Sequence, residues 1–471
     1  MQSIETKRDQ WGSKLGFIMA AAGSAVGLGN LWKFPFLAGQ NGGGAFVAVY
    51  FVILFVVGFT LMMAEITVGR FAQLNAIGSY RKIKASWAWV GSLGVLAGFF
   101  ILSFYSVIGG WIISYLVKAA TGQFNTADVK VLGSMFSEFI SSAGSPIFYH
   151  AIFMLITLGI VIGGVQNGIE KYSKIMMPAL FIILILVVIR SVTLDGAMEG
   201  VKFFLTPDFS KITGGVILSA LGQVFFSLSL GMGCMITYGS YLSKDENIPQ
   251  SSMIIPLIDT GVALLAGLAI LPAVFAFGFS PSAGPGLLFI TLPAVFSKMP
   301  LGSLCAVAFF VLALFAAVTS SISLLEVCVS YVVDEWKWTR KKSTLLISAV
   351  IFLLGIPCSL SQGPWAHITL IKGKNILDSV DFVATNVLLP LGGILLSIFV
   401  GWVWGLGKTQ RIHKTDDGKT VITWELEYTD AIKEVTNDGR INFPLAPIWV
   451  FLIKWVAPIA ISIVFFQGIF A

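Results

Sequence analysis

Eleven long apolar stretches run through this chain of 471 residues, separated by segments that carry most of its charge. A helix needs about 20 predominantly apolar residues to cross the hydrocarbon core of a bilayer, and the stretches have about this length. Only 11% of the residues are charged, whereas about 25% is typical of soluble domains. The sequence therefore predicts an all-α polytopic membrane protein and excludes a soluble enzyme or a disordered chain. The predicted spans are residues 14–38, 44–70, 89–118, 148–166, 172–190, 213–242, 253–279, 302–333, 343–360, 382–406 and 446–469.

Two of the connecting segments have a character of their own. Residues 280–300 (SPSAGPGLLFITLPAVFSKMP) are moderately apolar but broken by Pro and Gly, which favours a re-entrant or capping helical hairpin over a span. Residues 408–442 form the longest polar stretch, and we predict a solvated loop with some amphipathic character there. A β-barrel is excluded because residues 179–189 and 302–317 are apolar on every face, whereas barrel strands alternate.

The distribution of Lys and Arg predicts the orientation of the chain. With the N-terminus in the cytoplasm, the inner segments hold 20 of the 30 basic residues, as the positive-inside rule requires. An odd number of spans then places the C-terminus outside. The N-terminal segment has no long apolar region of its own, so we expect no cleaved signal peptide.

Several functional classes lack the residues that they need. The four cysteines (Cys234, Cys305, Cys328, Cys358) lie in apolar runs without a CxxC pair, and the three histidines are scattered. No nucleophile–base pair, HExxH motif or metal-ligand cluster suggests an intramembrane enzyme. The basic residues lie between spans instead of in one patch, so nucleic acid is not an expected partner, and no organic cofactor is predicted.

Spans one and six differ from the other nine. Span one contains AAAGSAVGLGNLWKFP (Ala20–Pro35), and span six contains FFSLSLGMG (Phe225–Gly233). Each Gly costs about 1 kcal/mol relative to Ala inside a helix, so these clusters favour interruptions. The two spans are five apart, so the second set of five has the opposite topology. Interrupted spans at matching positions are typical of transporters built from inverted repeats, here residues 1–191 and 192–406, followed by residues 407–471 with the eleventh span.

A simpler explanation for one such span is that small residues let helices pack closely. For a single span the two explanations are about equally good. For two spans at matching positions, each beside Asn or Ser, we favour broken helices.

The motifs resemble one known family over nearly the whole chain. GSAVGLGNLWKFP followed by NGGGAF, FFSLSLGMG, TSS (Thr319–Ser321) and SFYSVIGGW ending at Trp111 occur in the order typical of the neurotransmitter:sodium symporter family. The resemblance is strongest to its bacterial amino-acid transporter branch (LeuT/MhsT-like). It implies a LeuT-type inverted five-helix repeat with discontinuous helices 1 and 6, and sodium-coupled symport of amino acids across the bacterial plasma (inner) membrane. The expected departure from the family is at the end, where we predict eleven spans and not the twelve that are common in the family.

The resemblance also implies two sodium sites. A broken helix exposes carbonyl oxygens that suit a hard cation, and the half-helix that follows presents N–H groups to an anion. The substrate carboxylate would complete the first site. On this reading, sodium site 1 uses Ala25, Asn30, Ser227 and Asp259, and sodium site 2 uses Gly23, Val26, Ala316, Thr319 and Ser320. Without the family context, back-bonding of the span-eight hydroxyls to a preceding carbonyl would be the better interpretation.

Asp259 is an acid within an apolar span, which marks a functional residue by default. Chloride-dependent members of the family have a neutral Asn at the matching position and bind an anion. We therefore predict chloride-independent transport, with proton counter-movement as an open alternative. Two further intramembrane acids are Glu65, which resembles a family acid that braces the broken first helix, and Glu326, for which only a hydrogen bond is suggested.

The resemblance implies a substrate pocket for an α-amino acid. Gly27 stands where monoamine carriers place an Asp, so the substrate should supply its own carboxylate. N–H groups near the first break and a tyrosine hydroxyl would bind that carboxylate, and an apolar wall would take a hydrophobic or aromatic side chain. The pocket residues are Ser24, Leu28, Gly29, Ile101, Tyr105, Phe226, Ser229, Met232, Ser320 and Leu324.

Gates are expected on both sides of this pocket. Lys33 and Asp381 match the outer gate, where the family usually has Arg, which pairs more directionally than Lys. Phe226 and Tyr105 would form the lid. Gly168 and Pro178 reproduce a Gly-x9-Pro motif at the inner end of span five, where Pro removes a helical hydrogen bond and favours unwinding. The inner gate would use Arg8, Asp334 and Tyr241.

Three other mechanisms remain as alternatives. A channel is disfavoured because both gates have residues and no pore-lining ring is present. The second alternative is a sensor that has the fold of a transporter but moves no solute; the sequence fits it as well as it fits a transporter. Proton coupling is the closest rival, although two sets of neutral oxygen ligands favour sodium. The lipid bilayer and a small amino acid are the only partners that the sequence implies; no obligate protein partner is indicated.

Overall fold

The computed structural model describes residues 8–279, 286–405, 408–414, 420–426 and 430–470. In this part of the chain nine helices are long and apolar enough to cross a membrane, and ten if the bent pair Lys14–Ala25 and Gly29–Gln40 is one span. The prediction of an all-α polytopic membrane protein is confirmed. The count of eleven stays a prediction, because the segments 214–227 and 234–239 are too short to be counted on their own.

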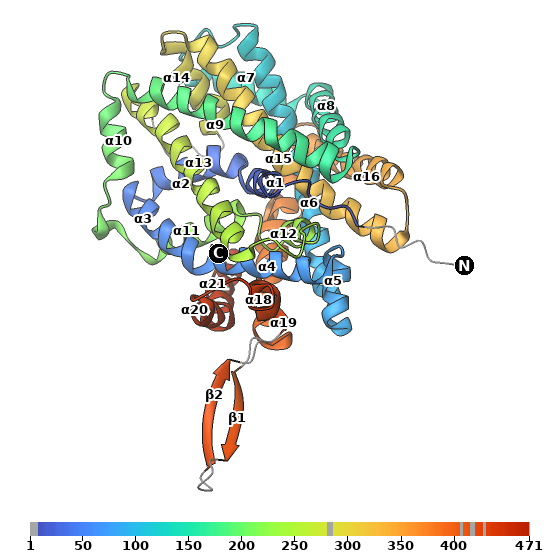
Figure 1. The fold of residues 1–471 in the computed structure, drawn as a ribbon. Helices are drawn as coiled ribbons and strands as arrows, with labels where there is room; N and C mark the ends of the chain where they lie inside the picture. The colour runs from blue at the N-terminus through green and yellow to red at the C-terminus, as the bar shows by residue number, and fades with distance from the viewer. Residues whose placement is uncertain (1–7, 280–285, 406–407, 415–419, 427–429, 471) are drawn as a thin grey trace.

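Most spans are single helices or helices that pass through one π-helical turn (Figure 1). Span one is built from α1 and α2, and span six from α11 and α12. In chain order the helices of the spans are α1 (Lys14–Ala25), α2 (Phe34–Gln40), α3 (Gly44–Ile53), α4 (Phe59–Ala72), α6 (Ala88–Ala120), α8 (Gly144–Val161), α9 (Lys171–Val192), α11 (Gly214–Ser227), α12 (Cys234–Gly239), α13 (Ile248–Ala276), α15 (Gly302–Trp336), α16 (Arg340–Leu360), α17 (Ile376–Phe382), α18 (Leu389–Ile398), α20 (Ala446–Phe451) and α21 (Ala457–Phe470).

Both predicted interruptions are present. In span one the chain leaves the helix after Ala25 and resumes at Gly29 in a π-helical turn, with a bend of 52° between the two halves. In span six α11 ends at Ser227 and α12 begins at Cys234. The connection passes through the left-handed region at Ser229 (φ +54°), Gly231 (φ +78°) and Gly233 (φ +72°). Glycine adopts this region without steric cost, which explains the Gly-x-Gly pair.

One predicted boundary is wrong. We expected span four to run to residue 166, but α8 ends at Val161 and the π-helical turn Val165–Glu170 already opens span five. The apolar run IVIGGV hides the turn, which Gly164 makes possible with φ +84°. The glycine of the Gly-x9-Pro motif therefore lies inside the π-helical turn, and Pro178 lies inside α9.

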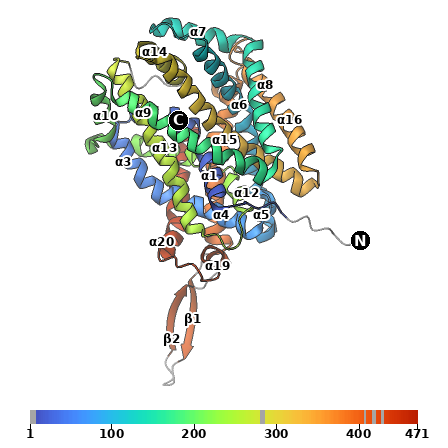
Figure 2. The ribbon, with the colours of Figure 1, turned by 45° about the horizontal axis from the view of Figure 1, so that its top comes forward.

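Short helices and one pair of strands lie between the spans. They are α5 (Ala76–Ile83), α7 (Val129–Ser141), α10 (Ala197–Leu205), α14 (Leu292–Lys298), α19 (Asp430–Thr436) and the antiparallel strands β1 (Lys408–Lys414) and β2 (Thr420–Leu426). The hairpin projects away from the helical body in both views (Figures 1 and 2). The prediction of a loop over residues 408–442 is thus wrong where β1 and β2 form. The run TVIT in β2 is rich in β-branched residues, which favours a strand, but the overall polarity of the segment favoured a loop. Of the predicted re-entrant segment, residues 280–285 lie outside the described residues, and the rest contains α14.

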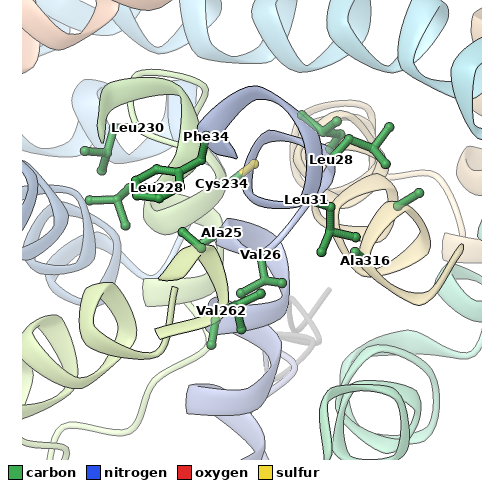
Figure 3. Packing of buried hydrophobic residues seen from close by; sticks show 14 of the residues in the cluster. Ala25, Val26, Leu28, Leu31, Phe34, Leu228, Leu230, Cys234, Val262 and Ala316 are labelled. Atoms are coloured by element: carbon green, nitrogen blue, oxygen red, sulfur yellow. The ribbon is translucent and has the colours of Figure 1, made fainter. Parts of the chain in front are cut away.

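The first helix lies at the centre of the bundle. α1 contacts α9, α13 and α15, and nine of its twelve residues are buried, from Gly16 to Ala25. Apolar side chains from both breaks are buried around it. In Figure 3, Leu228 and Leu230 of span six lie on the same side of span one as Phe34, whereas Leu28 lies on the other side, toward the helix of Ala316. This packing holds the interrupted backbones of both spans against each other.

Candidate functional site

Three of the four residues assigned to sodium site 1 meet at Asp259, whose side chain is fully buried on α13. Asn30 Nδ2 donates to Asp259 Oδ1 over 2.8 Å, and Ser227 Oγ donates to Asp259 Oδ2 over 2.9 Å. Asn30 Oδ1 accepts from the Gly27 N–H over 3.0 Å and so caps the unwound backbone. The carboxylate therefore joins the breaks of spans one and six. Ala25, the fourth residue, is the last residue of α1.

The residues assigned to sodium site 2 lie where α15 passes the first break. Ser320 Oγ lies 3.1 Å from the Val26 carbonyl oxygen, 3.2 Å from that of Ser24 and 3.5 Å from that of Gly23. Thr319 Oγ1 donates to the carbonyl of Ala316 over 3.1 Å, which is the back-bonding expected of a helical threonine. The structure thus brings the Ser320 hydroxyl to the carbonyls of the break, all of them uncharged oxygens, whereas the Thr319 hydroxyl bonds within α15.

A small cavity borders both clusters. Its wall contains all ten predicted substrate residues together with Ala25, Gly27 and Ser227. The Leu28 N–H approaches the Tyr105 hydroxyl at 3.5 Å, at the polar end of the cavity. Ser229 Oγ donates to the Ser24 carbonyl over 2.8 Å, so this hydroxyl serves the backbone of span one, and the side-chain end of the cavity is more apolar than the sequence suggests.

Gly27 is part of the cavity wall. A Cβ at Gly27 would lie 2.7 Å from Ser320 Oγ and 3.2 Å from Tyr105 Oη. Any larger side chain there would occupy the cavity. The position therefore requires glycine if a ligand with its own carboxylate is to reach the Leu28 N–H.

On the outer side, Phe226 is a wall shared by two cavities. It borders the central cavity and a second, larger one, which is also lined by Lys33 and Thr385. The Lys33 ammonium lies 4.4 Å from the centre of the Phe226 ring, a cation–π distance. In the described residues no salt bridge joins Lys33 to Asp381, so the predicted outer pair is not closed in this conformation. The ring attracts the lysine instead.

The predicted inner gate is closed. Arg8 Nη1 lies 2.6 Å from Asp334 Oδ2, and the Arg8 guanidinium lies 4.7 Å from the centre of the Tyr241 ring. Arg8 also donates to Ser240 Oγ over 2.7 Å, and Trp11 Nε1 donates to the Tyr238 carbonyl over 3.0 Å. The N-terminal segment is therefore attached to both α12 and α15 beneath the cavity.

Arg340 is a neighbour of the predicted inner gate that the sequence did not reveal. It pairs with Glu326, whose Oε1 also accepts from the Tyr241 hydroxyl over 2.6 Å. Glu326 thus has a role: it connects α15 to the inner end of span six and to the start of α16. The sequence could have predicted this pairing, because an acid inside a membrane span needs a partner and Arg340 is the first residue of the span that follows.

The prediction for Glu65 is corrected. Glu65 Oε1 accepts from the Gly231 N–H over 2.6 Å, so this acid braces the break of span six and not that of span one. The reason is topological, because α4 packs along α12. The left-handed turn at Gly231 leaves an N–H without a helical acceptor, and the Glu65 carboxylate supplies one.

At the inner end of span five, the Gly168 backbone touches the preceding turn, and a Cβ there would overlap the Ile160 carbonyl. Nearby, Glu170 accepts from the Gly12 N–H over 2.6 Å and from Ser13 Oγ over 2.9 Å. This contact between span five and the N-terminal segment was not predicted; no motif in the sequence marks it.

A helical membrane bundle with two broken spans around a central cavity that is lined by backbone polar groups and hydroxyls as well as apolar side chains has the architecture of an ion-coupled secondary transporter. The family comparison agrees: the model of the sodium:neurotransmitter symporter family matches residues 8–130 and 128–435. The chain belongs to this family, and it is accordingly a sodium-dependent membrane transporter and not an enzyme.

Two relatives and one solved structure resemble the chain over its full length. An uncharacterised sodium-dependent transporter of Bacillus subtilis, YhdH, is 44% identical over 98% of both chains. A sodium-dependent transporter of Haemophilus influenzae is 37% identical over 100% of both. The crystal structure of MhsT in complex with L-phenylalanine matches with a TM-score of 0.85 and 44% identity, covering 98% of this chain and 100% of that one.

Proposed function

We propose that this protein is a symporter of hydrophobic or aromatic L-amino acids that is driven by two sodium ions and independent of chloride. It works by alternating access through the inner and outer gates described above. The observation that carries the proposal is the central cavity, which lies between two clusters of oxygen ligands and has an N–H and a hydroxyl at one end and an apolar wall at the other.

The chemistry of the wall supports the substrate class. Ile101, Phe226, Met232 and Leu324 contribute no hydrogen-bonding side-chain groups except a thioether, so a charged or strongly polar substrate side chain would be desolvated without compensation. The Met232 thioether is flexible and adapts to rings and branched chains. That MhsT binds L-phenylalanine is consistent with an aromatic side chain in the corresponding place.

The charges support the ion coupling. In the described residues no Lys or Arg forms a salt bridge with Asp259, and its carboxylate accepts hydrogen bonds from uncharged side chains, among them Asn30 and Ser227. A buried carboxylate without a cation favours binding of one. A sodium ion there, completed by the substrate carboxylate, would couple the two solutes directly. The site near Ser320 would hold the second ion by neutral oxygens alone.

The distribution of basic residues supports the orientation that we propose. Arg8, Asp334 and Tyr241 lie on the side to which the positive-inside rule assigns the N-terminus, so we place the N-terminus in the cytoplasm of a bacterial cell and the C-terminus outside. Sodium would favour this inward-closed form, and unwinding at Gly168 would admit water to the second ion. The two five-helix repeats, residues 1–191 and 192–406, supply the breaks at span one and span six.

The test is equilibrium binding of tritiated Leu, Phe, Tyr, Trp, Ala and Glu to the purified protein with sodium, potassium or lithium as the only cation. We expect sodium-specific binding of the four large apolar amino acids. Tyr105→Phe should weaken binding about tenfold, the effect of losing one hydrogen bond to a charged group. Tyr115→Phe is the matched control, because Tyr115 lies on the same helix outside the cavity.

Three results of binding and uptake measurements would contradict parts of the proposal. Binding that is equal in sodium and potassium would refute the ion sites. Uptake into vesicles that follows an imposed pH gradient without sodium would favour proton coupling in its place. Preference for Glu over Phe would refute the apolar subsite while leaving the ion coupling intact.

A further inference from the structure

We propose that Glu434, on α19 in the segment before the last span, is a cytoplasmic latch that favours the inward-closed state. Its carboxylate holds this segment on the part of the bundle that carries the inner gate. The inference rests on the proposed alternating access, and it adds a positioning residue far from the cavity. It concerns neither the ion sites nor the substrate.

The first half of the latch is a buried arginine. Arg70, at the inner end of α4, has no exposed side-chain surface. Its Nε donates to Glu434 Oε1 over 2.7 Å, its Nη2 donates to the Glu434 backbone carbonyl, and its Nη1 donates to the carbonyl of Glu246. A buried guanidinium is costly unless it is paired and its donors are used. Glu434 supplies both the charge and one of the carbonyls.

The second half of the latch is a lysine beside the inner gate. Lys244 Nζ lies 3.0 Å from both Glu434 oxygens and 3.1 Å from the Arg70 carbonyl oxygen. Lys244 follows Tyr241, the aromatic residue of the gate, by only three positions. One carboxylate therefore connects α19 with the inner ends of span two and of span six at once.

Arg70 lies on α4, and Lys244 lies in the turn that follows α12, and these two helices pack backbone against backbone. A Cβ at Gly69 on α4 would clash with the Ile236 carbonyl of α12, and a Cβ at Gly239 on α12 would lie 2.7 Å from the Ile66 carbonyl oxygen of α4. Because the two backbones are in contact, α4 and α12 move as one unit. Opening of the gate at α12 must then change the position of both cations relative to α19.

α19 is attached by packing as well as by charge. Ala431, Ile432 and Val435 of α19 are themselves buried against the bundle. The chain then continues to Trp449, whose Nε1 donates to the Thr60 carbonyl of α4 over 3.1 Å. This second attachment lies on span eleven and does not involve Glu434. Loss of the carboxylate should therefore loosen α19 without detaching the last span.

The experiment is hydrogen–deuterium exchange of the full-length protein in detergent, read by mass spectrometry without any amino acid. We compare the wild type with Glu434→Gln and with Lys433→Gln, the exposed neighbour on the same helix. If the latch is real, Glu434→Gln speeds exchange about fivefold in two gate segments, residues 8–13 and 234–241, as expected for loss of about 1 kcal/mol. Lys433→Gln leaves both segments unchanged.

Faster exchange confined to residues 430–446 would overturn the proposal, because Glu434 would then only anchor its own helix. If Glu434→Gln does not fold, Lys244→Gln gives the same two outcomes with a smaller effect, since the Lys244 side chain is 50% exposed. The measurement needs neither sodium nor substrate. A failed binding assay for the proposed function and a failed latch are therefore distinguishable.

Discussion

Replacing Asp259 by Asn tests the central electrostatic argument about this site. The substitution removes one negative charge and keeps the shape of the side chain. Asp259 is fully buried, and its oxygens accept from Asn30 Nδ2 at 2.8 Å and from Ser227 Oγ at 2.9 Å. An asparagine retains one acceptor oxygen, so one hydrogen bond can persist while the charge is lost.

The expected loss of sodium affinity lies between two limits. Replacing a charge-assisted hydrogen bond by a neutral one costs about 1.5 kcal/mol at the low end. The Coulomb energy of two unit charges 4 Å apart is about 4 kcal/mol at an effective dielectric constant of about 20. Sodium affinity should therefore fall about 10- to 1,000-fold, because each 1.4 kcal/mol is about a factor of ten.

The assay is sodium-dependent binding of tritiated phenylalanine in gluconate or in chloride buffer. The wild type should be insensitive to chloride, whereas Asp259→Asn should bind weakly in gluconate and partly recover in chloride, which restores a negative charge beside the ion. Ser227→Ala is the matched control, because it removes a hydrogen bond and keeps the charge; chloride should not help it. Wild-type sodium affinity of Asp259→Asn in gluconate would refute the reasoning.

Three further predictions concern the fold and the cycle. Gly69→Ala should lower the thermal unfolding midpoint by several degrees, because its Cβ would clash with the Ile236 carbonyl. Gly261→Ala is the control: its Cβ would meet no atom within 4 Å, so the midpoint should stay unchanged or rise. A fluorescence melt measures both midpoints. Pro178→Ala should restore a helical hydrogen bond and slow uptake into vesicles while equilibrium binding stays intact; equal losses of both would contradict the unwinding role. Ser320→Ala should weaken sodium binding about tenfold or more, because one of the oxygens beside the first break is lost; a sodium titration of phenylalanine binding measures it.

Composition and motif order together specify much of this protein. The apolar stretches predict a helical membrane protein because a bilayer leaves the backbone no other partner than itself. The glycine clusters at Gly23–Gly29 and Gly231–Gly233 predict both broken helices because each glycine weakens a helix and because the two clusters stand at matching positions, five spans apart. Glycines alone would not be enough, since α6 contains five of them without a break. The ten pocket residues were placed by their motifs, and the structure gathers all of them around one cavity.

Pairings between distant segments depend on the tertiary structure. Glu65 braces span six, Glu326 pairs with Arg340, and Glu434 joins Arg70 to Lys244, although none of these residues carries a motif that names its partner. The turn between spans four and five was hidden because every residue in it is apolar or glycine. A one-dimensional pattern records which residues avoid water, whereas the partner of a buried charge is decided by which helices pack together, and only the folded bundle contains that information.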